Sequence, residues 1–220
     1  GSRNKEEVLH SIPDMAIECV RIINHEMAQY GDRDFIIWGH SMGSFIAYEV
    51  MKKIQNCGYR LPVFLILSGT LAPDCIGSLC IDERTKTQED FVNYLVDFRL
   101  LNSKIVNSRV FKKVYMPVVK NDYEVLRDYK TDVEVIRNVN TYIINGNEDD
   151  LKQDDVLLWK SYFEKEPCFE WMQGGHFFLL QNVKEVMKGV KSFEKKTVTE
   201  CHSAKYSVIQ GHECLSSCLA

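Results

Sequence analysis

The chain has 220 residues, of which 45% are hydrophobic and 26% charged, and its formal net charge is −4. This length suits one domain with a sizeable core, and the mildly acidic balance argues against a nucleic-acid-binding protein, whose surface is basic. Because no apolar run approaches the roughly 20 residues that cross a bilayer and no secretory leader opens the chain, we expect a soluble, cytoplasmic protein without membrane contact.

The first predicted elements alternate between helix and strand. A helix is expected over Ile12–Tyr30, where apolar residues form a stripe that Gly31 ends. The apolar run 35–38 predicts a buried strand, a helix follows to about Gln55, and residues 63–69 predict a second buried strand. A strand, a helix and a strand in succession indicate a right-handed parallel crossover.

From about residue 76 to residue 130 the alternation is interrupted. Residues 89–101, 108–115 and 123–129 have the pattern of short helices, and no strand signal lies between them. We expect this stretch to be a helical lid inserted into the domain. A plain helical connection is the alternative.

The alternation resumes towards the carboxyl end. Strands are predicted over residues 140–146 and 168–172, with a helix over 156–163 between them, and an amphipathic helix over 182–193 closes a domain of residues 1–193. Residues 194–220 lose periodicity and are expected to form a flexible tail. The eight cysteines of the chain lack a framework spacing, so we expect reduced thiols, and the Cys201-His202 pair of the tail is not a zinc knuckle.

The pentapeptide Gly39-His40-Ser41-Met42-Gly43 lies between the first predicted strand and the helix after it. A G-x-S-x-G pattern in this context is a nucleophile elbow, in which the serine hydroxyl is raised above the sheet. The glycines are expected because a side chain at either position would clash with a neighbouring strand or helix. Ser41 is therefore the candidate nucleophile, and the backbone N–H of Met42 is the candidate oxyanion donor.

A nucleophilic serine needs a base, and the base needs a group that orients it. His176 directly follows the last predicted strand, and Asp149 follows the strand over 140–146. The order Ser41, Asp149, His176 is that of the α/β-hydrolases, and all three would lie at the carboxyl edge of one parallel sheet. We therefore expect an α/β-hydrolase fold, with a mostly parallel sheet, helices on both faces and an inserted lid.

Two alternatives remain open for the acid. Asp150 is adjacent to Asp149, and Asp74 follows the second predicted strand. His40, beside the nucleophile, is expected to point away from the site and to be structural.

Three segments together resemble the type II thioesterases, stand-alone enzymes that serve fatty acid, polyketide and nonribosomal peptide synthases, and among them the animal medium-chain enzymes of fatty acid synthesis. The segments are 39–44 (GHSMGS), 145–149 (NGNED) followed by Trp159, and 174–179 (GGHFFL). The resemblance covers roughly residues 4–190. In the family, the opening strands carry a loop that supplies a second oxyanion N–H. We expect no counterpart of these strands in this sequence.

The resemblance implies hydrolysis of acyl thioesters by Ser41, His176 and Asp149, without a metal or organic cofactor. It also implies a monomer whose substrate is carried by an acyl carrier protein or by coenzyme A. Apolar lid residues would provide a channel for the acyl chain. The candidates for this channel are Phe91, Leu95, Phe98, Val110 and Tyr115.

Two other functions remain open on the sequence alone. One is a carboxylesterase or lipase that prefers oxygen esters. The other is a non-catalytic α/β-hydrolase fold that serves as a binding module.

Overall fold

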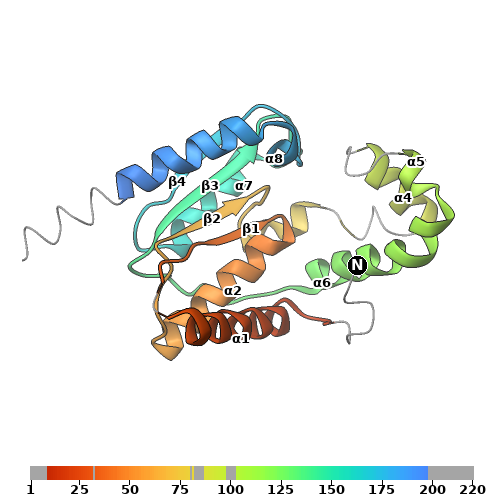
Figure 1. Cartoon of the computed structure of the whole chain (residues 1–220). Helices are drawn as coiled ribbons and strands as arrows, with labels where there is room; N and C mark the ends of the chain where they lie inside the picture. Colours follow the sequence, from red (N-terminus) through yellow and green to blue (C-terminus); the bar gives the residue numbers. More distant parts are fainter. Residues whose placement is uncertain (1–8, 32, 80, 82–86, 98–102, 198–220) are drawn as a thin grey trace, which may run out of the picture. The chain divides into compact units, whose positions relative to one another are not determined.

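The computed structural model describes residues 9–31, 33–79, 81, 87–97 and 103–197 (Figure 1). Its chain divides into two compact units, Gly1–Phe178 and Leu179–Ala220. The structure joins none of the four cysteines that it describes (Cys19, Cys57, Cys75 and Cys168) in a disulfide. The cysteines and histidines of the tail lie outside the described residues.

The first unit is built on a parallel sheet of strands in the order β1-β2-β3-β4. Its strands are β1 (Ile37–His40), β2 (Phe64–Ser68), β3 (Asn140–Gly146) and β4 (Cys168–Met172). The predicted bounds of β3 and β4 are confirmed, whereas β1 lies closer to the carboxyl end than predicted and includes His40. The α/β class with a parallel sheet is thus confirmed.

Both faces of β2 are buried. Leu65 and Leu67 of β2 belong to the main hydrophobic cluster, and the alternate residues Phe64 and Ile66 are also buried. This is why β2 is a continuous apolar run instead of an alternating one.

Helices α1 (Ile12–Tyr30) and α2 (Met42–Cys57) lie side by side in Figure 1 and pack against each other. The first helix has the predicted bounds because Ser11 caps it by accepting the Asp14 N–H. After β3, α7 (Gln153–Leu157) continues into a 3₁₀ turn, η3 (Leu158–Tyr162). Trp159 of this turn is fully buried against aromatic side chains of α2.

The described residues of the predicted lid region form mainly short helices. They are the 3₁₀ helix η1 (Pro73–Leu79), α4 (Gln88–Asp97), α5 (Ser103–Val106), the π-helix η2 (Phe111–Tyr115) and α6 (Met116–Asp128). Figure 1 shows α4 and α5 projecting away from the sheet, with α6 returning towards it. The lid has a small hydrophobic cluster of its own, formed by Phe91, Leu95, Val106, Phe111 and Met116.

A buried carboxylate fastens the end of the lid to α2. Glu49 is only 6% exposed, and its Oε1 accepts hydrogen bonds from the Tyr129 hydroxyl at 2.8 Å and the Thr131 hydroxyl at 2.6 Å. The Lys52 ammonium is 3.2 Å from the same oxygen. Buried charges occur in proteins when they are paired and hydrogen-bonded, and this one meets both conditions.

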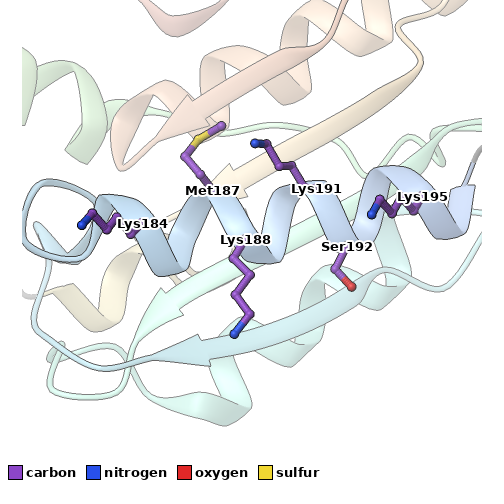
Figure 2. A pocket seen from close by; sticks show the side chains of 6 residues that line it. All are labelled: Lys184, Met187, Lys188, Lys191, Ser192 and Lys195. Atoms are coloured by element: carbon purple, nitrogen blue, oxygen red, sulfur yellow. The ribbon is translucent and has the colours of Figure 1, made fainter.

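The second unit contains a helix over residues 183–197, which extends past the predicted end at residue 193. Six side chains of this helix line a hollow of about 590 Å³. They are labelled in Figure 2 and are Lys184, Met187, Lys188, Lys191, Ser192 and Lys195. Within the part of the chain that the structure describes, we find no helix with the length and apolar character needed to cross a membrane.

Candidate active site

Ser41 lies at the sharp turn between β1 and α2. Its backbone has φ 55° and ψ −124°, a conformation that L-residues rarely adopt. The Ser41 N–H donates to the Ser68 carbonyl at 2.8 Å, and the Ser41 carbonyl accepts the Ser44 N–H at 2.9 Å. Met42 is the first residue of α2, so its N–H belongs to the first turn, where helical N–H groups have no intrahelical acceptor.

The two glycines of the pentapeptide differ in their surroundings. A Cβ on Gly39 would overlap the Gly43 carbonyl and would lie 2.7 Å from Ser44 Cα. A Cβ on Gly43 would meet nothing within 4 Å among the described residues. The expected clash is therefore present at Gly39, while the same expectation for Gly43 is wrong for the structure as described.

The structure brings Ser41, His176 and Asp149 into one hydrogen-bonded chain. His176 Nε2 is 3.0 Å from Ser41 Oγ, and His176 Nδ1 is 2.9 Å from Asp149 Oδ2. The side chains of His176 and Asp149 are 16% and 8% exposed, so little water competes for these contacts. In this geometry the imidazole can accept the serine proton while the carboxylate holds its other nitrogen.

The other two candidate acids lie elsewhere. Asp150 donates its backbone N–H to Asp149 Oδ1 at 2.8 Å, which helps to fix the Asp149 carboxylate. Asp74 is in η1, beside Tyr162, where burial, followed by the interaction with Asp74, raises the pKa of this tyrosine. The oxygen that reaches His176 belongs to Asp149.

Buried polar groups that the sequence analysis did not single out hold the strand ends in place. Asn145 Oδ1 accepts the Thr70 N–H at 2.9 Å, and Asn145 Nδ2 donates to the Thr70 carbonyl at 3.2 Å, so one amide ties the end of β3 to the loop after β2. Ser44 Oγ lies 3.1 Å from the Gly39 carbonyl and 3.2 Å from the Ser68 carbonyl. For Asn145, the signal available in the sequence was a polar residue at the end of an apolar run.

His40 does not point away from the site, contrary to our expectation. Its ring lies against that of His176, with 5.1 Å between the centroids. Consecutive side chains point to opposite faces only in extended strands, and the positive φ of Ser41 ends the strand at His40. Burial, followed by the nearby charge of His176, lowers the pKa of His40 to about 4.

This lowered pKa predicts a loss of stability in mild acid. A histidine has a pKa of about 6.5 in the unfolded chain, so His40 binds its proton there first, and protonation favours unfolding. The contribution is complete above pH 6.5 and is lost as the pH falls towards 4. Between pH 7 and pH 4, urea unfolding should show the wild type losing about 2 kcal/mol more than His40→Phe, after allowance for partial exposure of the ring.

The matched control for this prediction is His25→Asn, because His25 is exposed on α1. It should keep the wild-type dependence on pH. The same dependence in His40→Phe would contradict the assignment to His40.

The candidate channel residues lie in different surroundings. Phe91 and Leu95 are 3% and 2% exposed and belong to the lid's own cluster. Val110 and Tyr115 are exposed on the lid. Phe98 lies outside the described residues.

Comparisons with known proteins show that the chain is similar to thioesterases. The thioesterase AngT of anguibactin biosynthesis in Vibrio anguillarum, described as probable, is 26% identical over 74% of this chain and 66% of its own length. The human medium-chain S-acyl fatty acid synthase thioesterase is 25% identical over 70% of this chain and 58% of its own length. The chain thus spans about two thirds or less of these relatives.

Among solved structures, ClbQ from the colibactin NRPS/PKS pathway has the same fold. It has a TM-score of 0.71 and 20% sequence identity, over 90% of this chain and 83% of that one. A sequence profile of the thioesterase domain matches residues 1–193. This profile covers most of the sequence, and the chain therefore belongs to the thioesterase domain family.

Proposed function

We propose that this protein hydrolyses acyl thioesters through an acyl-serine intermediate. His176 takes the proton of Ser41 as Ser41 Oγ attacks the thioester carbonyl, and the N–H of Met42 donates to the oxyanion. The C–S bond breaks, the thiol leaves with the proton that His176 held, and an ester of Ser41 remains. Water, deprotonated by His176, then attacks this ester and releases the free acid, which restores the serine.

Asp149 has two tasks in this proposal. Its carboxylate keeps the Nδ1 proton of His176 in place, so that Nε2 is free to accept the serine proton. It also stabilises the imidazolium that forms in each step. The sequence of contacts from Asp149 to His176 to Ser41, inside a chain of the thioesterase domain family, is the observation that carries the proposal.

The thiol of the substrate is proposed to be the phosphopantetheine arm of an acyl carrier protein, or coenzyme A. A thiol with a pKa of about 8.5 leaves far more readily than an alcohol, so the leaving group needs little help from a general acid. The human relative is named as a fatty acid synthase thioesterase and AngT as one of anguibactin biosynthesis, which supports chain release or editing for a synthase. We propose a cytoplasmic monomer that needs neither a metal nor an organic cofactor.

The test compares octanoyl and palmitoyl pantetheine thioesters with the matched oxygen esters. The wild type should turn over the thioesters faster, and Ser41→Ala should lower thioester turnover at least 10³-fold. A fluorophosphonate, which reacts covalently with activated serines, should label the wild type at Ser41. Preference for the oxygen esters would instead favour a carboxylesterase or lipase, and a wild type that resists labelling would favour a binding module.

A further inference from the structure

The imidazole of His176 has a second imidazole packed against it. The rings of His40 and His176 are tilted by 45° with their centroids 5.1 Å apart. Gly69, at φ 57°, makes room for both rings, since a Cβ there would lie 2.6 Å from His40 Cε1 and 3.3 Å from His176 Cε1. The contact is therefore built into the backbone at the end of β2, and a side chain at position 69 would disturb it.

Hydrogen bonds fix the orientation of the His40 ring and favour one tautomer. His40 Nδ1 is 3.1 Å from Ser68 Oγ, which also accepts the Trp38 indole N–H at 3.0 Å and donates to the Gly39 carbonyl at 3.1 Å. A hydroxyl has one proton to donate. With that proton directed to Gly39, the Ser68 oxygen accepts from His40, and the His40 proton is on Nδ1.

This tautomer leaves the other nitrogen of the ring uncharged and unprotonated. His40 Nε2 is buried and has no hydrogen-bond partner among the described residues. A buried acceptor without a partner is less costly than a buried N–H without one, which agrees with a proton on Nδ1. The burial that lowers the pKa of His40 to about 4 keeps the ring neutral throughout the range in which a triad works.

We propose that His40 is a positioning residue for His176, whose neutral ring holds the catalytic imidazole in line between Ser41 and Asp149 and shields one side of it from water. This inference rests on the proposed triad chemistry. A neutral neighbour is required because His176 becomes positively charged as Ser41 attacks, and a second positive charge at this distance would oppose the step.

The other groups that face His176 in the described part of the chain agree with this role. Asp149 offers a negative charge to Nδ1, and Ser41 offers a hydroxyl to Nε2. Phe177 presents an apolar ring 5.2 Å away, nearly perpendicular to the imidazole. His40 is thus the only other titratable group that these contacts place beside the ring.

Two variants separate the ring of His40 from its hydrogen bond. His40→Phe keeps a neutral aromatic ring but cannot donate to Ser68, whereas His40→Asn keeps an N–H near the position of Nδ1 but loses the ring. The first readout is the rate of fluorophosphonate labelling of Ser41 as a function of pH. The second is the downfield proton resonance of His176 Nδ1, which reports the bond to Asp149 and requires no activity.

In His40→Asn, we expect the fluorophosphonate to label Ser41 about 10- to 100-fold more slowly. Small misplacements of a catalytic group cause losses of this size. The acid limb of its pH profile should move upwards, because water beside the imidazole favours the charged form. The Nδ1 resonance should broaden or disappear. Turnover of a pantetheine thioester should show a lower kcat with an unchanged KM. His40→Phe should stay within about threefold of the wild type and keep the resonance.

Wild-type labelling rate, pH profile and resonance in His40→Asn would overturn the inference. Equal losses in both variants would also overturn it, because His40→Phe keeps the aromatic ring to which the inference assigns the effect. A loss of stability without a change in the pH profile would indicate a merely structural role. If the wild type is not labelled, the resonance still decides. Its loss in His40→Asn alone would uphold the positioning role while the proposed hydrolysis fails, and its persistence in that variant would refute the role.

Discussion

Replacing Asp149 with Asn is expected to lower kcat for thioester hydrolysis about 10⁴-fold while the protein stays folded. The side-chain amide has the shape of the carboxylate, but its nitrogen offers a proton where His176 Nδ1 needs an acceptor. The imidazole then turns its unprotonated nitrogen towards residue 149 and can no longer accept the proton of Ser41. Steady-state kinetics on a pantetheine thioester, with circular dichroism to verify folding, make the measurement.

The controls for this prediction are the two other candidate acids. Asp150→Asn keeps the backbone N–H that reaches Asp149, and Asp74 lies beside Tyr162, so both variants should stay within about threefold of the wild type. A loss of 10³-fold or more in Asp74→Asn, with activity kept in Asp149→Asn, would show that the acid had been assigned to the wrong strand end.

Gly39→Ala is expected to destabilise the protein by more than about 4 kcal/mol, the range reached when a new side chain overlaps a packed backbone. The added methyl group would overlap the Gly43 carbonyl and would lie too close to Ser44 Cα. Both obstacles are backbone atoms of the first turn of α2, so neither can swing aside without opening the turn at Ser41. If folded protein is obtained, urea unfolding measures the loss of stability. In the extreme case, the variant would be absent from the soluble fraction.

Gly43→Ala is the matched control, since the same methyl group on the same turn meets open space among the described residues. Alanine is also the better helix former, so the change in unfolding free energy should stay within about 1 kcal/mol. Equal stability of the two variants would mean that the close approach at Gly39 is not a constraint.

The sequence predicted the positions of Ser41, Asp149 and His176 relative to the strands because each follows a recognisable apolar run. The bounds of α1 and β3 were also predictable, from an apolar stripe that Gly31 ends and from an apolar run that ends in glycine. These are local signals. The sequence therefore predicted those parts of the fold and of the candidate site that short stretches of chain determine.

Other features depend on contacts that a single stretch does not contain. The strand β1 reaches His40 because His40 pairs with Ser68 of β2. The apolar run 35–38 by itself does not tell in which register the two strands pair. In the lid, α6 begins at Met116 instead of Tyr123, since Pro117 is in its first turn, where proline is tolerated. The π-helix η2 has no sequence pattern that distinguishes it from an α-helix.

The separate cluster within the lid has a consequence for how the molecule opens. Tyr123 packs against both the lid cluster and the main core, while Glu49 fastens the segment after α6. Because the buried residues of the lid cluster form a group separate from the main core, the predicted lid region can unfold as a cooperative unit of its own, at a free energy below that of global unfolding. Amide hydrogens of α4 would exchange with solvent long before those of β2 and β3, and the chain would spend part of its time with an intact sheet while α4 and α5 are unfolded.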